Sequence, residues 1–266
     1  MIGRRLVTVA IALPVLLVAM WVGSWLWLAL VSAIAAVGVH ETMTLFERME
    51  MGASVAWAWG AAAVALAPTV ACAFGVLPLS ALGLGPLAAW IVVLVAFLLA
   101  PGDRPFRGFL GEFGAALYPA WLLGFLVLLR FGPHGLGTTF WLMAVVWVGD
   151  AAAYGAGSLL GGPHVVPGIS PGKTLSGFVA GFVFAMAAAV AMRQLPHLGL
   201  GAAAGVSALL VVASQFGDLA ESLLKRRAGV KDSGTVLPGH GGVLDRFDGV
   251  LLAAPVLYYC LTLLRP

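Results

Sequence analysis

Charged residues are scarce in this sequence. Only 9% of its 266 residues are Asp, Glu, Lys or Arg, whereas soluble domains usually carry about a quarter charged residues. Residues 6–39 contain no charged residue, and neither do residues 51–102. Each of these runs exceeds the roughly 20 residues that a helix needs to cross a bilayer. A water-soluble globular domain is therefore excluded, and each run is expected to hold two membrane helices.

Cysteine is also scarce, and the sequence has no basic patch. Cys72 and Cys260 both fall in apolar stretches, where cysteine usually serves as a small hydrophobic residue, so no disulfide or cysteine metal site is expected. The net charge of +3 is not gathered in a basic patch interleaved with aromatic residues, so nucleic acid is not expected as a partner. The apolar run after residues 1–5 is longer than the core of a cleaved signal, which favours a retained anchor helix.

Apolar residues are what the chain has in excess, at 62% of the sequence and a mean hydropathy of +1.05. The runs are continuous and lack the alternation of barrel strands, which predicts an all-α fold, a polytopic transmembrane helical bundle. Within it we expect N-terminal membrane helices over 1–110, and over 111–266 the helices that carry the catalytic site, with a cytoplasmic segment at 218–247. The nine predicted spans are about 6–22, 24–40, 54–74, 85–100, 111–130, 138–157, 174–192, 199–217 and 248–264.

The basic residues predict an orientation for these nine spans. When the chain is threaded through the bilayer, only Arg130, Arg193 and Arg265 of the 14 Lys and Arg residues fall on the side opposite the N-terminus. Cytoplasmic loops carry an excess of Lys and Arg, so the N-terminus is predicted to be cytoplasmic.

Acidic residues gather in two places. Asp150 stands alone inside a predicted span, and a charge at membrane depth marks a functional site by default because it is costly to insert. Asp218, Glu221, Ser222 and Lys225 follow one another at i, i+3, i+4 and i+7, which places them on one face of a helix. This face is suited to a hydrated divalent cation and a phosphate, although an ordinary polar stripe with intrahelical ion pairs would have the same spacing.

A glycine-rich and basic segment follows that helix. Gly239, Gly241 and Gly242 allow backbone N–H groups to approach an anion closely, and the cations around them neutralise its charge. Asp245 and Asp248 then stand one turn apart at the start of the last span. Paired carboxylates beside a basic, glycine-rich loop are typical of Mg²⁺-dependent phosphate chemistry, and a simple positive-inside loop does not explain them.

The order and spacing of these motifs resemble the signature of the phosphatidate cytidylyltransferases, the CDP-diacylglycerol synthases. The motifs are SLLKR at 222–226, KDSG at 231–234, LPGHGG at 237–242 and DRFD at 245–248, with GDAAAY at 149–154, ISPGKT at 169–174 and QFGD at 215–218 upstream. Residues 1–100 match only in hydropathy. The chain departs from the family pattern at Leu175 and Ser176, where the family usually has an aromatic and then an acidic or amide residue.

The resemblance implies an enzyme that transfers the cytidylyl group of CTP to phosphatidate. It would be a multi-pass protein of the cell (inner) membrane, with its active site facing the cytoplasm, Mg²⁺ or another divalent cation as cofactor, and a homodimeric assembly. The implied catalytic residues are Asp218, Lys225, Asp245 and Asp248. Asp218 and Asp245 are the implied metal ligands, with Glu221, Asp248 and Asp150 as further candidates. The implied substrate-binding residues are Ser170, Lys173, Ser222, Arg226, Lys231, His240 and Arg246, where His240 either touches the nucleotide or fixes the loop.

Two other functions share part of this pattern. A CTP-dependent polyprenol or phytol kinase would also bind CTP beside a lipid, but the motifs at 222–248 argue against it. A transporter of a phosphorylated metabolite would also have an intramembrane carboxylate and a basic vestibule. Its polar groups should be scattered near the middle of several spans, whereas these are predicted to cluster at one interface.

Overall fold

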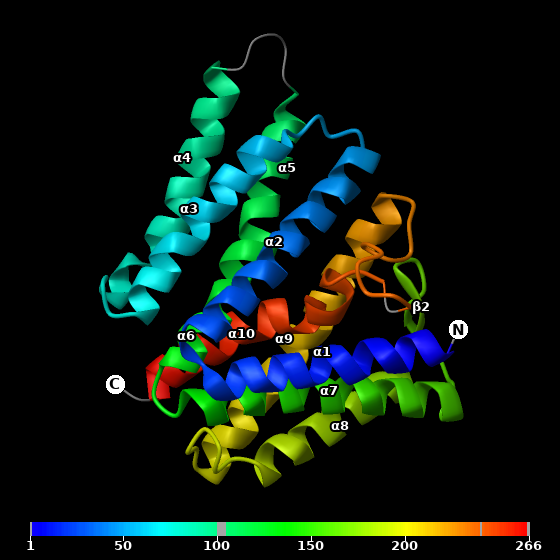
Figure 1. The fold of residues 1–266 in the computed structure, drawn as a ribbon. Helices are drawn as coiled ribbons and strands as arrows, with labels where there is room; N and C mark the ends of the chain where they lie inside the picture. Colours follow the sequence, from blue (N-terminus) through cyan, green and yellow to red (C-terminus); the bar gives the residue numbers. More distant parts are fainter. Residues whose placement is uncertain (1, 100–104, 240, 265–266) are drawn as a thin grey trace. The chain divides into compact units, whose positions relative to one another are not determined.

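The computed structural model describes residues 2–99, 105–239 and 241–264, most of which are helical (Figure 1). In chain order the elements are α1 (Ile2–Val22), α2 (Ser24–Arg48), α3 (Val55–Ala73), the 3₁₀ turn η1 (Leu79–Gly83), α4 (Leu84–Leu99), α5 (Phe106–Ala115), the π-helical stretch η2 (Ala116–Trp121), α6 (Leu122–Phe131), α7 (Gly135–Leu160), β1 (His164–Val166), β2 (Ser170–Thr174), α8 (Leu175–Ala191), α9 (Leu200–Arg227) and α10 (Leu244–Leu264).

The predicted all-α, multi-helix fold is confirmed. Within the described ranges each predicted span coincides with a helical segment, since α5, η2 and α6 run on as one segment over Phe106–Phe131. Seven of the described segments are long and apolar enough to cross a membrane. The apolar stretches of the other two, Val7–Val22 and Leu175–Ala191, are shorter. The predicted spans differ from the helices at several ends: α2 runs on to Arg48 rather than ending near 40, α9 continues to Arg227, and α10 begins at Leu244 rather than near 248.

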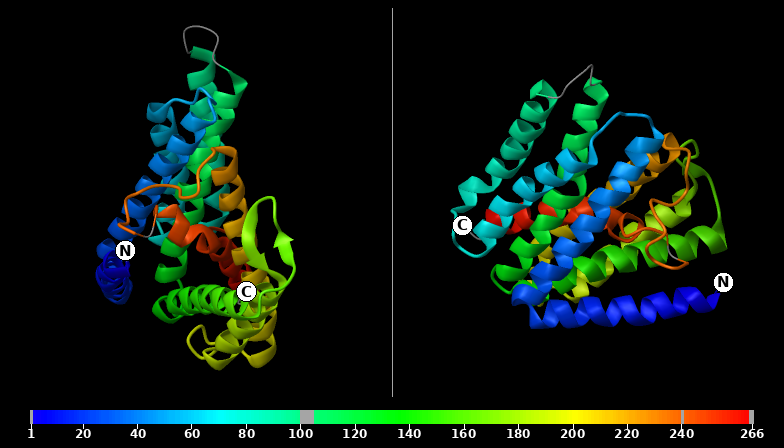
Figure 2. Two further views of the ribbon diagram at one scale, coloured as in Figure 1. Left: turned by 90° about the vertical axis from the view of Figure 1, so that its right-hand side faces the viewer. Right: turned by 45° about the horizontal axis from the view of Figure 1, so that its top comes forward.

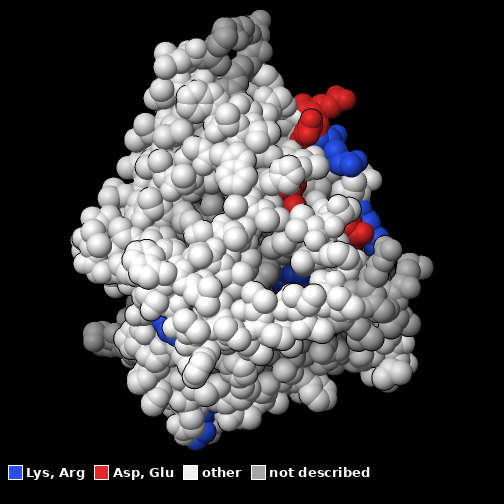
Figure 3. Space-filling view, in the orientation of Figure 1, with Lys and Arg blue, Asp and Glu red and all other residues white. Residues whose placement is uncertain are grey.

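The helices present large apolar side chains outward, as lipid-facing helices do. Trp21 is 73% exposed, Trp25 72% and Leu99 77%. On the face drawn in Figure 3 most atoms belong to uncharged residues, and charged side chains occupy only a few places. Monomeric soluble proteins rarely expose contiguous apolar surface on this scale. The structure therefore fits a protein that lies within a bilayer.

The described residues form two compact units. Unit 1 takes in α1 to α6 and the segment Arg227–Arg246, within the bounds Met1–Gly132 and Arg227–Arg246. In its core the Trp27 indole N–H of α2 donates to the carbonyl oxygen of Leu126 on α6 at 3.0 Å. The Arg130 guanidinium donates to the carbonyl oxygens of Met20 and Trp21, which satisfies acceptors that the end of α1 leaves open.

Unit 2 takes in Pro133–Arg226 and Phe247–Pro266, so it holds α7, the two strands, α8, nearly all of α9 and most of α10. Helices α7 and α8 run side by side and antiparallel (Figures 1 and 2). Small residues make their close approach possible: a Cβ atom at Gly177 would lie 2.6 Å from the Ala153 carbonyl oxygen, and one at Gly181 would lie 3.0 Å from that of Gly149. Small residues at such positions are a usual means of packing helices in membranes.

Between α7 and α8 the chain forms a short antiparallel hairpin of β1 and β2. His164 pairs with Thr174 and Val166 pairs with Ser170. Gly161 and Gly162 end α7 with φ values of +61° and +116°, which glycine adopts readily. Thr174 then caps α8, because its hydroxyl accepts the Gly177 N–H. The sequence did not predict this hairpin.

Candidate active site

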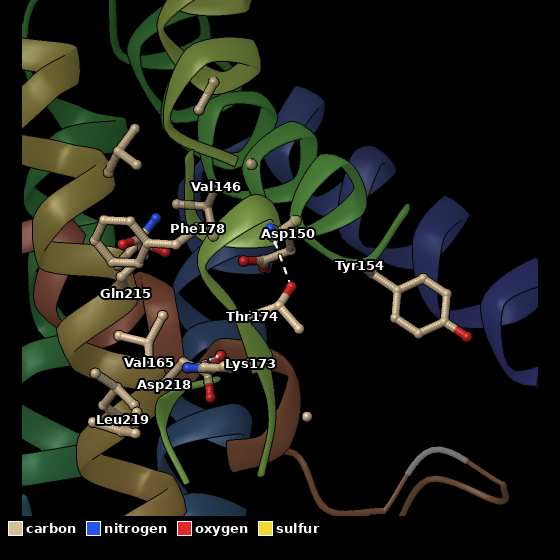
Figure 4. A pocket seen from close by; sticks show the side chains of 18 of the residues that line it. Val146, Asp150, Tyr154, Val165, Lys173, Thr174, Phe178, Gln215, Asp218 and Leu219 are labelled. Atoms are coloured by element: carbon tan, nitrogen blue, oxygen red, sulfur yellow. Dashed lines mark hydrogen bonds and ion pairs between the residues drawn. The ribbon is translucent and has the colours of Figure 1, made fainter. Parts of the chain in front are cut away.

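A cavity of about 260 Å³ lies inside unit 2, among α7, the hairpin, α8 and α9. Its polar lining includes Asp150, Lys173, Gln215 and Asp218 (Figure 4). The rest of the lining is mainly apolar and includes Val145, Val146, Phe178, Ala185 and Val211. Charged groups beside an apolar wall suit a molecule that has both a charged and an apolar part.

Two polar contacts attach the hairpin to α9. Lys173 Nζ of β2 lies 2.6 Å from Asp218 Oδ2 (Figure 4), and the Arg226 Nε–H donates to the carbonyl oxygen of Ile169 at 3.2 Å. The Ser222 hydroxyl also donates to Asp218 Oδ1, at 3.2 Å. Asp218 therefore receives both a cation and a hydroxyl, and three predicted site residues, Lys173, Asp218 and Ser222, are brought together. Ser170 lies half-buried at the start of β2.

The predicted polar face of α9 is confirmed. Besides the contact between Ser222 and Asp218, Lys225 Nζ lies 3.1 Å from Glu221 Oε2, and both of these side chains are buried. That contact is an intrahelical ion pair, as the plainer interpretation of the spacing also expected. The Asp248 side chain of α10 contacts Glu221 and lies near Asp218 and Lys225.

Two glycines allow α9 and α10 to cross closely at this cluster. A Cβ atom at Gly217 would collide with the carbonyl oxygen of Asp248, and one at Gly249 would collide with the hydroxyl of Ser214. Because the backbones almost touch at this point, Asp218, which follows Gly217, and Asp248, which precedes Gly249, are kept near one another.

Asp245 belongs to unit 1, where the segment between α9 and α10, residues 228–243, surrounds its carboxylate and is called the glycine-rich loop below. Asp245 Oδ2 accepts the Ser233 N–H at 2.9 Å and the Gly242 N–H at 2.7 Å, and it lies 3.0 Å from the Ser233 hydroxyl. Gly239 and Gly241 have φ values of +79° and +83°. The Gly242 amide, which the sequence suggested as a donor to a bound anion, thus donates to the protein's own carboxylate. His240 lies outside the described residues.

The outer side of this loop carries exposed charge, and its inner side faces a residue that the sequence analysis missed. Lys231, Asp232 and Arg246 are exposed. On the inner side the Glu41 carboxylate of α2, which is 2% exposed, accepts three hydrogen bonds from the loop and from the first residue of α10. A buried acidic residue within a segment that can cross a membrane is a signal for function. Nothing in the sequence pairs Glu41 with residues some 200 positions away.

Helices α7 and α8 each carry a polar residue that the sequence singled out, Asp150 on α7 and Ser176 on α8. Asp150, which stands alone inside a predicted span, lines the cavity and is exposed to it, and the Tyr154 ring points away from Lys173 and Asp218 (Figure 4). At the departure from the family pattern, the Ser176 hydroxyl donates to the carbonyl oxygen of Gly161 and lies 3.0 Å from the Thr174 hydroxyl. Ser176 thus joins the start of α8 to the end of α7.

The carboxylates fit a divalent cation in their chemistry. Mg²⁺ usually takes one or two carboxylates and completes its shell with water and substrate phosphates. Asp218 and Asp248 lie near one another and supply such oxygens. Over the described ranges no three or more His, Cys, Asp or Glu side chains form a metal-binding group. The pairing of Asp218 with Asp245 stays a prediction.

Comparison with known proteins places the chain in a family. The model of the cytidylyltransferase family matches residues 3–264. Among curated proteins, the phosphatidate cytidylyltransferase of Brucella suis biovar 1 (strain 1330) is 50% identical over 127 residues, 47% of each chain. The protein of that name from Bacillus subtilis (strain 168) is 41% identical over 155 residues, 56% of each chain. The chain spans about half the length of the curated relatives it matches. Because the family model covers nearly all of its length, the chain belongs to the cytidylyltransferase family.

Proposed function

We propose that this protein transfers the cytidylyl group of CTP to phosphatidate, giving CDP-diacylglycerol and pyrophosphate. The observation that carries the proposal is the polar cluster of unit 2, in which Lys173, Asp218 and Ser222 are in contact beside an apolar cavity. Family membership and the names of the relatives support the same reaction. An apolar wall suits acyl chains, and the charged groups suit phosphates.

The reaction needs neutralised charge more than an activated nucleophile. A phosphate oxygen of phosphatidate attacks the α-phosphorus of CTP, a new P–O bond forms, and the bond to the β-phosphate oxygen breaks as pyrophosphate leaves with its electron pair. Because the attacking oxygen is already anionic, positioning and electrostatic stabilisation supply most of the catalysis. A bound Mg²⁺ would neutralise the triphosphate and orient it for in-line attack.

Each predicted residue has a proposed part in this reaction. Asp218 and Asp245 would hold the divalent cation, with Asp248, Glu221 and Asp150 as further acidic groups around it. The phosphates of CTP or of the lipid would contact the remaining polar residues, which are Ser170, Lys173, Ser222, Lys225, Arg226, Lys231, His240 and Arg246. The contact of Lys173 with Asp218 supports this assignment, since a lysine beside a metal-binding carboxylate is well placed for a phosphate bound to the same metal.

We further infer that the site faces the cytoplasm of a cell whose inner membrane holds the protein, and that the protein is a homodimer. The surplus of Lys and Arg on the N-terminal side of the predicted topology supports this orientation. CTP is water-soluble and phosphatidate is a membrane lipid, so the two substrates can meet only at an interface.

The decisive experiment uses purified protein, phosphatidate, Mg²⁺ and CTP that is labelled at either the α- or the γ-phosphate. A cytidylyltransferase puts only the α-label into lipid. A lipid kinase that is given a polyprenol acceptor would put only the γ-label there. Label that enters lipid solely from the γ-position would refute the proposal. Vesicles that accumulate a phosphorylated metabolite without labelling lipid would instead indicate the transporter.

A further inference from the structure

Glu41 stands out among the buried groups of unit 1 that the proposed reaction does not use. Its carboxylate is 2% exposed on α2, within a segment that can cross a membrane. Glu41 Oε1 accepts the Val243 N–H at 2.9 Å, and Oε2 accepts the Leu244 N–H at 2.9 Å. Both amides belong to the start of α10, whose first N–H groups have no partner within the helix. The partial positive charge of a helix N-terminus stabilises a carboxylate in this position.

The same carboxylate holds the glycine-rich loop from its inner side. The Ser233 hydroxyl lies 3.0 Å from Glu41 Oε2 and 3.0 Å from Asp245 Oδ2. A hydroxyl has one proton and can donate to only one of the two carboxylates at a time. Asp245 already receives the amides of Ser233 and Gly242. Donation of the Ser233 hydroxyl to Glu41 therefore gives each carboxylate its own donors and joins the two through one serine.

The glycines of the loop leave room for Glu41. A Cβ atom at Gly234 would lie 2.5 Å from Glu41 Oε1, and one at Gly242 would lie 2.6 Å from the same oxygen. Ser233 and Gly242 are buried on this side of the loop, whereas Lys231, Asp232 and Arg246 are exposed on the other. The position of Glu41 thus sets which side of the loop faces outward and where the Asp245 carboxylate stands.

We propose that Glu41 is a positioning residue for the glycine-rich loop. Glu41 fixes this loop by joining the start of α10 to Ser233 and, through Ser233, to Asp245. This inference rests on the proposed function in one respect, namely that residues 231–246 contact CTP. Glu41 itself touches no substrate. Removal of the Glu41 carboxylate should therefore loosen the loop and raise the KM for CTP more than the KM for phosphatidate.

The chain offers a matched control in Glu112. This carboxylate is also fully buried in unit 1 and accepts a backbone N–H, that of Ser54 at 2.6 Å, at the start of α3. Glu41→Gln and Glu112→Gln make the same chemical change at closely similar burial, and the hydrogen bonds described above join Glu41 to the loop and Glu112 to Ser54. The glutamine NH₂ cannot accept a hydrogen bond, so one amide at the start of α10 loses its acceptor in Glu41→Gln.

The first measurement is steady-state kinetics of both variants in detergent. For Glu41→Gln we expect the KM for CTP to rise on the order of tenfold, given what one hydrogen bond to a charged group contributes, while the KM for phosphatidate stays within about twofold of wild type. A fold defect alone would lower the amount of active enzyme and leave both KM values unchanged. Glu112→Gln should show that pattern or none. An unchanged KM for CTP in Glu41→Gln would overturn the positioning role.

The second measurement is amide hydrogen exchange of the full-length protein, which needs no activity. In Glu41→Gln the exchange of Val243 and Leu244 should accelerate by about tenfold or more, and in Glu112→Gln only the region of Ser54 should change. Equal exchange at residues 233–244 in wild type and Glu41→Gln refutes the proposal. If wild type fails to label lipid, the proposed function falls while this measurement still decides whether Glu41 holds the loop. Should Glu41→Gln not fold, Glu41→Asp, which keeps the charge on a shorter side chain, takes its place with the same expectations.

Discussion

The crossing of α9 and α10 at Gly217 gives a sharp test of how the acidic cluster is assembled. A methyl group at this position would collide with the carbonyl oxygen of Asp248. Since a backbone carbonyl cannot rotate away as a side chain can, Gly217→Ala must push the two helices apart or tilt them. The displacement would act directly on Asp218 and Asp248, which adjoin the point of contact.

The size of the effect can be set against a control on the same helix. A Cβ atom at Gly205 of α9 would have no neighbour within 4 Å. Gly205→Ala should therefore stabilise the helix by about 0.5–1 kcal/mol, the usual gain of alanine over glycine. Overpacking costs about 1–3 kcal/mol, so Gly217→Ala should be destabilised by that order. Each variant adds one methyl group to the wild-type protein, and the two are expected to change its stability in opposite directions.

Thermal unfolding in detergent and the lipid-labelling assay together measure both consequences. Gly217→Ala should unfold several degrees below Gly205→Ala. Its turnover at a temperature where it is folded should fall by up to about a hundredfold, the cost of misplacing reacting groups by about 1 Å. If Gly217→Ala matched Gly205→Ala in both stability and turnover, the close crossing would not be what positions the acids.

Three other predictions follow from the site. Asp218→Asn and Asp245→Asn should each fold and lose on the order of a hundredfold in turnover, because they keep the shape and remove the charge; near-normal activity of both with unchanged Mg²⁺ dependence would contradict their metal role. Lys173→Met should slow the reaction on the order of a hundredfold and, with its partner gone, leave Asp218 more accessible to added Mg²⁺, which a Mg²⁺ titration measures. A cysteine placed in the 225–240 loop should resist an impermeant thiol reagent in intact cells, whereas one near Gln194 should react; labelling of the loop from outside would invert the topology.

The sequence predicted most of the helices and the polar face of α9 because both depend on local spacing. Long uncharged runs mark helices in a bilayer, whatever they pack against. The contact between Asp218 and Ser222 and the one between Glu221 and Lys225 are each four residues apart, so the helical repeat alone brings them together. These predictions needed no knowledge of tertiary structure.

What the sequence did not predict depends on contacts between distant segments. Glu41 approaches Val243 and Leu244 only because α2 packs in the same unit as the loop. The hairpin of β1 and β2 has three and five residues and no apolar alternation, so nothing in its composition separates it from a loop. The close crossing at Gly217 likewise depends on the helix that lies opposite. In each case the local sequence permits the arrangement and the tertiary partner selects it.

Apart from Asp150, which lies well inside α7, the charged site residues lie near helix ends, and this placement favours an interfacial enzyme over a transporter. Asp218 lies toward the C-terminal end of α9, and Asp248 lies in the second turn of α10. Lys173 immediately precedes the Thr174 cap of α8. A transporter would need such groups near the middle of its spans, where discontinuous helices hold a substrate. Charges near helix ends can stay hydrated while the apolar parts of the same helices remain in lipid, and such a placement suits the proposed reaction between a soluble triphosphate and a lipid phosphate.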